Sequence, residues 1–218
     1  MSRMLTVAAV LLGSAALVAQ ARPGPDALAR ALQLRYQGIR DFSAEFTHTY
    51  RGGALKTQTQ EQGTVAIKKP GRMRWVYTQP EKKEFVSDGF KIYSYLPADR
   101  QVFVSNVPPD DQASSAALFL AGKGDLARDF TAMYVDSPIQ GALALKLTPR
   151  HREPDYEYLI VAVDPGSLQI RAIATRDRQG GDSTIVFTKL KENQGLADKD
   201  FAFRIPRGVD VVTDGSRN

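Results

Sequence analysis

The chain has 218 residues, of which 43% are hydrophobic and 24% charged, and its formal net charge is +5 at pH 7. These values are ordinary for a globular protein of one good-sized domain or two small ones, with a substantial hydrophobic core. Cysteine is absent, which excludes disulfide bonds, thiol catalysis, cysteine-ligated zinc and a lipid on an N-terminal cysteine. The excess of basic residues is mild and forms no stripe, so no nucleic-acid partner is expected.

The first 21 residues have the layout of a secretory signal peptide. Arg3 supplies a basic start, residues 4–12 are apolar, and Ala19 and Ala21 form an Ala-x-Ala cleavage site. We expect cleavage after Ala21 and an exported chain of residues 22–218. An uncleaved membrane anchor is the alternative, because the apolar character extends to about Ala19. No linker argues for a second domain, so residues 22–218 are expected to form one.

A short amphipathic helix is predicted over residues 26–37. Asp26 suits the N-cap position, and Gly38 suits the end of the helix. Apolar residues between them recur with the helical period, at Leu28, Ala31, Leu32 and Tyr36.

From residue 42 onward the apolar period changes to two, which is typical of antiparallel strands with one buried face. Met73, Trp75 and Tyr77 show the pattern clearly. Hairpin turns are indicated at residues 87–90, 164–167 and 179–182. The expected strands are FSAEFTHTY, GTVAIKK, RMRWVY, KEFVS, KIYSYL, RQVFVS, ALALKLTP, YEYLIVAVD, LQIRAIATRD, STIVFTKLKEN and FAFRIP. Strands at this spacing predict a single antiparallel sheet that is strongly curled or nearly closed.

Residues 110–134 interrupt the β pattern with an Ala- and Leu-rich stretch. Gly122 and Gly124 divide it into two predicted helices, at 112–121 and 125–131. The apolar face of such an insertion must be buried, and the open end of a curled sheet is the expected place.

Catalytic signals are scarce. The two histidines, His48 and His151, are far apart in the sequence, and no cysteine is present to complete a zinc site. The Gly-x-Ser-x-Gly motif does not occur, and residues 120–124 lack the upstream glycine and the Ser/Thr of a phosphate loop. We therefore expect no cofactor, no metal and no enzymatic activity, but a binding function. Periodicity alone leaves open whether Met73 and its neighbours form an ordinary core or line a cavity, and favours the core.

Several segments combine into a distinctive pattern: FSAEFT (42–47), AIKKPGRMRWVY (66–77), QP (79–80), VSDG (86–89), IYSY (92–95) and FAFRIPRGVDVV (201–212). Together they resemble the periplasmic outer-membrane lipoprotein carrier family, LolA. The similarity extends over nearly the whole expected mature chain.

The resemblance implies a mainly β fold, an unclosed antiparallel β-barrel with an α-helical lid, whose hydrophobic interior holds lipoprotein acyl chains. It implies a monomeric periplasmic carrier that takes triacylated lipoproteins from an inner-membrane ABC transporter to an outer-membrane receptor. The residues expected to line the acyl-chain cavity are Leu28, Leu32, Phe46, Met73, Trp75, Ile92, Leu118, Phe119, Leu120 and Phe187.

One departure from the family pattern concerns lid control. The family often has arginine before the proline of this motif, where the guanidinium binds lid backbone, and this chain has Lys69. Lysine lacks the planar fork of arginine, so it should hold a lid more loosely. Alternatively, Arg72 shares the role.

Three alternatives remain. The first is a lipoprotein-sensing regulator of the same fold, but those proteins carry an additional C-terminal domain and this sequence stops soon after Val212. The second is a small secreted esterase built on His48. The third is a structural envelope protein that binds no lipid.

Overall fold

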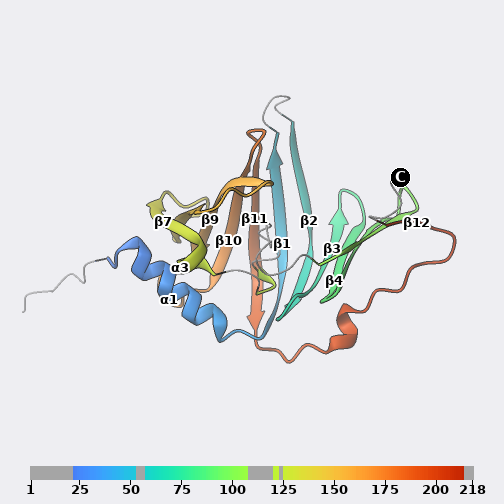
Figure 1. Ribbon diagram of the computed structural model, residues 1–218, viewed down its shortest axis with the longest axis horizontal. Helices are drawn as coiled ribbons and strands as arrows, with labels where there is room; N and C mark the ends of the chain where they lie inside the picture. Colours follow the sequence, from blue (N-terminus) through green and yellow to red (C-terminus); the bar gives the residue numbers. More distant parts are fainter. Residues whose placement is uncertain (1–21, 53–56, 108–119, 123–124, 214–218) are drawn as a thin grey trace, which may run out of the picture.

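The computed structural model describes residues 22–52, 57–107, 120–122 and 125–213, whose strands form one curled sheet (Figure 1). The strand order is β12-β6-β5-β4-β3-β2-β1-β11-β10-β9-β8-β7, and all neighbours are antiparallel except β12 and β6. Within the described residues no ladder joins β7 to β12, so the barrel is unclosed, as predicted. The strands are β1 Asp41–Arg51, β2 Gln58–Lys68, β3 Arg72–Gln79, β4 Lys83–Asp88, β5 Lys91–Leu96, β6 Gln101–Asn106, β7 Phe130–Val135, β8 Leu143–Pro149, β9 Tyr156–Val163, β10 Ile170–Asp177, β11 Asp182–Glu192 and β12 Asp210–Thr213.

The alternation of β3 sets the inner face of the sheet. Met73, Trp75 and Tyr77 are buried, whereas the residues between them are partly exposed. Directly opposed residues of paired strands share a face, and Trp75 lies opposite Val65 on one side and Phe85 on the other. The buried side chains of β1, β2, β3 and β11 therefore form one core with those of the N-terminal helix.

Helix α1, Pro25–Gln37, lies across one end of the sheet, below β7 to β11 in Figure 1. It starts one residue earlier than predicted, with Gly24 at the N-cap and Asp26 in the first turn, because proline suits the first helical position. Its buried face consists of Leu28, Ala29, Leu32 and Tyr36. Ala31, which we expected on that face, is exposed.

The second predicted helix is shorter than expected. Helix α3 spans Leu126–Asp129, with the Asp125 side chain accepting hydrogen bonds from the backbone N–H groups of Ala127 and Arg128. The chain then enters β7 at Phe130, which pairs with Pro149 of β8. Strand pairing outweighs local helix propensity there. The first predicted helix lies outside the described residues except for Leu120 and Ala121.

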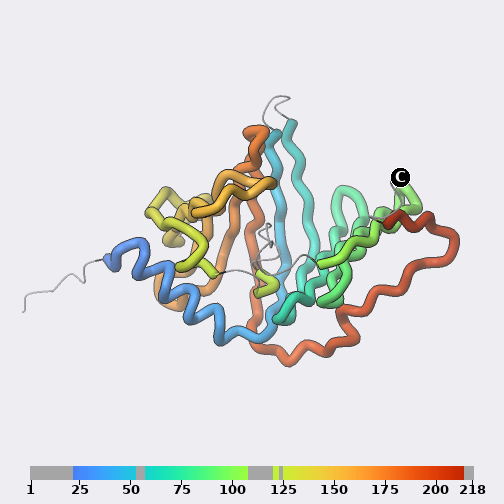
Figure 2. The backbone as a smooth tube through the Cα atoms, viewed as in Figure 1, coloured from blue at the N-terminus to red at the C-terminus, as the bar shows by residue number. Residues whose placement is uncertain are grey.

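The C-terminal segment FAFRIP does not form the predicted strand. Its first residue, Phe201, is the last residue of a 3₁₀ turn, η2 Asp198–Phe201. From there the segment runs along the sheet to the edge strand β12 (Figure 2). Phe201 is fully buried, and Phe203 stacks on Tyr93 of β5 with ring centroids 5.2 Å apart. Aromatic side chains, rather than a hydrogen-bonded ladder, attach this segment to the sheet. No helix among the described residues is long and apolar enough to cross a membrane.

Candidate functional site

Aromatic rings form a continuous wall on the inner face of the sheet. The ring of Phe46 lies 5.1 Å from that of Trp75 and 4.9 Å from that of Tyr77, both edge-on, and Trp75 lies 6.3 Å from Phe187. A Cβ added at Gly63 would come within 2.9 Å of the tip of the Phe46 ring and 2.0 Å of the Val76 carbonyl oxygen. Glycine at 63 therefore leaves the space in which Phe46 reaches across β2.

Most of the residues expected to line a cavity meet in one buried core. The members are Leu28, Leu32, Phe46, Met73, Trp75, Leu120 and Phe187. Ile92, on β5, is half-buried at the margin of this core. It lies opposite Ser87 of β4, which in turn lies opposite Met73 of β3. Leu118 and Phe119 lie outside the described residues.

Among the described residues, two hydrogen bonds to backbone carbonyl groups attach residues 120–122, called the lid segment below, to the core. The Tyr36 hydroxyl of α1 donates a hydrogen bond of 2.5 Å to the Leu120 carbonyl oxygen. The backbone N–H of Gly71, in the β2–β3 turn, donates one of 2.9 Å to the Ala121 carbonyl oxygen. Leu120 is 1% exposed and packs into the core. The lid segment thus fills part of the inner face with its own side chain.

Lys69 stands between the lid segment and the end of α1. Its ammonium donates to the Tyr36 carbonyl oxygen and lies 3.9 Å from the centre of the Tyr36 ring. Burial lowers the pKa of Lys69 to about 8, and burial also raises the pKa of the Tyr36 hydroxyl, with the Glu192 carboxylate adding to the rise. The carbonyl oxygen and the ring of Tyr36 both stabilise the charged form of the Lys69 amine.

The stem of Lys69 is close to the lid segment. Gly122 has a φ of +86°, and a Cβ there would come within 2.6 Å of Lys69 Cδ. Both the backbone conformation and the close approach of Lys69 therefore favour glycine at this position. Beside this contact lies a hollow of about 310 Å³, partly open to solvent, lined by Gln33, Tyr36, Gln37, Ile39, Arg40, Lys69, Pro70 and Gly122.

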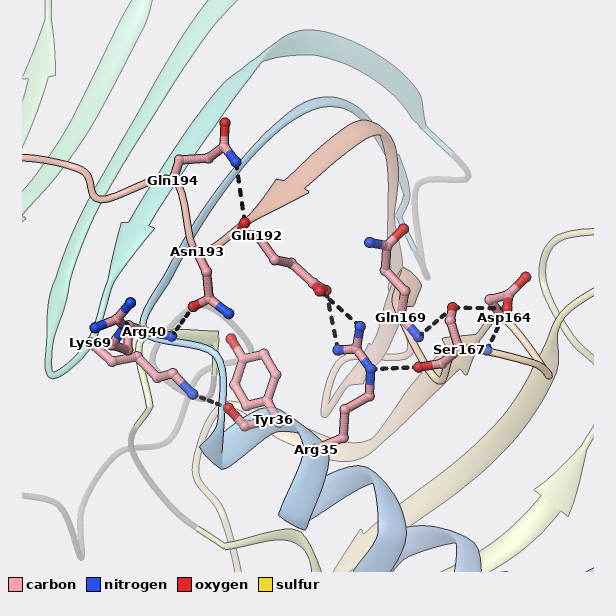
Figure 3. A network of polar contacts seen from close by, with 10 residues as sticks. All are labelled: Arg35, Tyr36, Arg40, Lys69, Asp164, Ser167, Gln169, Glu192, Asn193 and Gln194. Carbon is pink, nitrogen blue, oxygen red and sulfur yellow. Dashed lines mark hydrogen bonds and ion pairs between the residues drawn. The ribbon is translucent and has the colours of Figure 1, made fainter.

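A polar network holds the C-terminal end of α1 in place (Figure 3). Arg35 forms a bidentate pair with Glu192, at 2.8 and 3.1 Å, and its Nε donates to the Ser167 carbonyl oxygen at 2.5 Å. The backbone N–H of Arg40 donates to the Asn193 side chain at 2.8 Å. Sequence reasoning missed Arg35, Tyr36 and Glu192 as site residues, because partners so distant in the sequence leave no local signal.

Arg72, the other expected lid residue, contacts a different part of the chain. Its guanidinium lies 3.6 Å from the Asp198 carboxylate, which also pairs with Lys68 at 2.5 Å. These two cations lower the pKa of Asp198, Lys68 contributing most through its hydrogen bond. Among the described contacts, Arg72 therefore attaches the C-terminal segment, and the lid segment is attached by α1 and the β2–β3 turn.

Around Leu120, the described residues leave little space between the lid segment and the sheet. Where Leu120 meets Ile170 and Phe187, the enclosed void has a volume of about 10 Å³. That is about the minimum for one water molecule, and far below the 300 Å³ or more typical of ligand pockets. An apolar ligand can reach this part of the inner face only if the lid segment moves.

His48 lies at the far end of the aromatic wall, within a polar cluster. Its Nε2 is 2.8 Å from the Ser183 hydroxyl and its Nδ1 is 3.1 Å from the Glu61 carboxylate. Lys83 pairs with the other Glu61 oxygen at 2.5 Å. Burial lowers the pKa of His48 and outweighs the raising effect of Glu61, so the imidazole is neutral at pH 7.

The distances in this cluster are those of a Ser–His–acid triad, but the described residues around Ser183 do not form an oxyanion site. Ser183 lies within β11, paired with Tyr50 on one side and Thr175 on the other. Hydrolysis of an ester needs donors for the oxyanion, typically two free backbone N–H groups. The backbone N–H groups near Ser183 that could act as such donors belong to strands already paired on both sides. No cluster of metal-binding side chains occurs in the part of the chain that the structure describes.

The sequence matches the family described as "Outer membrane lipoprotein carrier protein LolA" over residues 37–204. The chain belongs to this LolA family. The match includes the aromatic wall, Lys69 and the lid segment. Tyr36, which holds the Leu120 carbonyl, lies one residue before it.

Individual relatives agree with this assignment. An outer-membrane lipoprotein carrier protein of Dechloromonas aromatica is 32% identical over 176 residues, which cover 81% of this chain and 83% of the relative. That of Cupriavidus taiwanensis is 29% identical over 201 residues, covering 90% and 93%. Among solved structures, an uncharacterized conserved protein from Thermus thermophilus has a similar fold, with a TM-score of 0.54, 13% identity and coverage of 85% of this chain and 98% of that one.

Proposed function

We propose that this protein is a periplasmic carrier that shields the acyl chains of triacylated lipoproteins on the inner face of its sheet. Cargo is accepted from an inner-membrane ABC transporter and passed to an outer-membrane receptor. Membership of the LolA family supports the carrier role. The observation that carries the proposal is an apolar inner face covered in part by a segment that polar contacts from Tyr36 and Gly71 hold there among the described residues.

The energetics favour such a removable cover. A buried methylene contributes about 0.8 kcal/mol, so one long acyl chain contributes roughly 10 kcal/mol. Three chains in a perfect pocket would exceed the practical limit of about 20 kcal/mol for noncovalent binding, and release would be too slow. Leu120 already occupies part of the apolar face, so cargo must displace it, which weakens net binding.

Loading then requires an external source of energy. We found no nucleotide-binding motif in the sequence, so the transporter is proposed to supply that energy. The outer-membrane receptor needs only a higher affinity for the same chains.

The direct test is mass spectrometry of protein purified from periplasm, followed by transfer to receptor-containing vesicles. Acylated peptides that co-purify and are released to the receptor support the carrier. Co-purification without transfer would favour a lipoprotein-sensing regulator, and absence of acylated peptides would favour a structural envelope protein.

A second candidate, a secreted esterase, is favoured by the distances between Ser183, His48 and Glu61. The occupied backbone on both sides of Ser183 argues against it. Hydrolysis of a chromogenic fatty-acyl ester by wild type, but not by a His48→Ala variant, would establish this activity.

A further inference from the structure

The side chain of Trp75 presents an unusual polar group on the inner face. It is the single tryptophan of the chain and is 4% exposed. Its indole Nε1–H is buried and has no hydrogen-bond partner among the residues that the structure describes. Indole is a donor only, and buried tryptophan usually finds an acceptor. An unmade hydrogen bond of this kind destabilises the folded core.

Several other buried polar side chains have partners. The Ser87 hydroxyl donates to the Gly71 carbonyl oxygen at 2.7 Å, and the Asp41 carboxylate accepts from the backbone N–H groups of Gln194 and Gly195. The Tyr36 hydroxyl donates to Leu120. A Glu84 oxygen without a hydrogen-bond partner lies 2.6 Å from Arg74 Nε and is compensated by that charge. Trp75 thus differs from these side chains, because neither a hydrogen bond nor a charged group compensates its N–H.

Among the described residues, the immediate neighbours of Trp75 in the sheet offer no acceptor. Val65 and Phe85 flank it in the ladder, and the rings of Phe46 and Phe187 pack against it. All four side chains are hydrocarbon. A water molecule is held in a protein interior only where two to four polar groups surround it, and these neighbours provide none. With no partner for Trp75 among the described residues, a largely apolar molecule that carries its own acceptor fits this place.

We propose that Trp75 Nε1–H donates to the carbonyl oxygen of an ester or amide that joins a fatty acyl chain to its head group. This inference rests on the proposed carrier function and adds a specificity to it. A fatty acyl ester combines a hydrocarbon tail with an acceptor that has no donor of its own, which matches a single donor within an aromatic wall. The inner face therefore distinguishes acylated molecules from alkyl chains of equal length that lack a carbonyl.

The test uses two soluble probes that differ in one group: a palmitoyl lysophospholipid, with an ester, and its hexadecyl ether analogue. Both are titrated into the full-length mature chain labelled with ¹⁵N. Because the chain has one tryptophan, a single indole N–H resonance reports on Trp75. We expect the ester to bind about 5- to 150-fold more tightly than the ether, the range that corresponds to one buried hydrogen bond, and to move the indole resonance downfield.

Two variants separate the hydrogen bond from simple packing. Trp75→Phe keeps an aromatic ring without the N–H, and should bring the ester-to-ether affinity ratio to about one. Phe187→Leu alters a neighbouring ring of the same wall without changing a donor, and should weaken both probes while leaving their ratio unchanged. If Trp75→Phe does not fold, the wild-type affinity ratio and resonance shift still decide the question.

Equal affinities for ester and ether, with an unmoved indole resonance, would overturn the role of Trp75 and leave the carrier function intact. Failure of both probes to bind, together with absence of acylated peptides from periplasmic protein, would overturn both. A higher affinity for the ester that persists in Trp75→Phe would assign the selectivity to another donor and reject Trp75.

Discussion

The Tyr36→Phe substitution removes a single oxygen atom from the attachment of the lid segment. The Tyr36 hydroxyl is buried and donates to the Leu120 carbonyl oxygen at 2.5 Å. Without the hydroxyl, the Leu120 carbonyl oxygen loses this hydrogen bond while the lid segment is in place. When the lid segment moves away, water can donate a hydrogen bond to the same oxygen. A buried unsatisfied acceptor costs about 1–3 kcal/mol, so the equilibrium between closed and open forms should shift about 5- to 150-fold toward opening.

Native-state hydrogen exchange measures this equilibrium directly. The Gly71 N–H donates to the Ala121 carbonyl oxygen, so its exchange reports release of the lid segment. We expect faster exchange at Gly71 by the factor above, with little change at core strand amides such as Val161. Tyr134→Phe is the matched control, because its hydroxyl donates to the Pro23 carbonyl at an exposed site, 2.8 Å away. Equal exchange at Gly71 in wild type and Tyr36→Phe would refute the reasoning.

Further predictions concern Lys69, Gly122 and His48. Lys69→Leu removes the ammonium from the Tyr36 carbonyl and ring, so lipoprotein retention should rise and transfer to the receptor should slow; a reconstituted assay in which neither changes would contradict the lid mechanism. The pKa of Lys69 is about 8 in the folded chain against an ordinary 10.5, so between these values the unfolded chain binds more protons and the free energy of unfolding should rise with pH. Urea denaturation from pH 7.5 to 10 should show that the free energy of unfolding rises more in wild type than in Lys69→Arg, whose side chain stays charged. If the free energies of the two proteins change with pH in parallel, the lowered pKa of Lys69 is contradicted. Gly122→Ala places a Cβ at a positive φ and against the Lys69 stem, which should speed Gly71 exchange roughly 5- to 30-fold for a strain of about 1–2 kcal/mol, whereas Gly141→Ala, also at positive φ but with open space around it, should not. His48→Ala should leave the hydrolysis of fatty-acyl esters at the background rate of wild type, and a loss of measurable activity would revive the esterase.

The strands and the inner face were predictable because they depend on local alternation. In RMRWVY the buried and half-exposed residues alternate as the sequence does, since successive side chains of a strand point to opposite faces. The same rule failed for FAFRIP, where Phe201 and Phe203 pack on the sheet without a ladder. Residues 130–131 were wrongly assigned to a helix because their pairing partners in β8 lie some distance along the chain.

The sequence by itself determined that this protein has a mainly β fold with an apolar inner wall, and its motifs pointed to a lipoprotein carrier family. Only the tertiary structure decided how that wall is closed. Tyr36 meets Leu120, and Arg35 meets Glu192, across separations in the chain of 84 and 157 residues. Such contacts depend on the register of distant strands and on where α1 lies, which no local period encodes. The indole N–H of Trp75, which has no partner among the described residues, is of the same kind, because only the folded arrangement of its neighbours reveals that no acceptor lies near it.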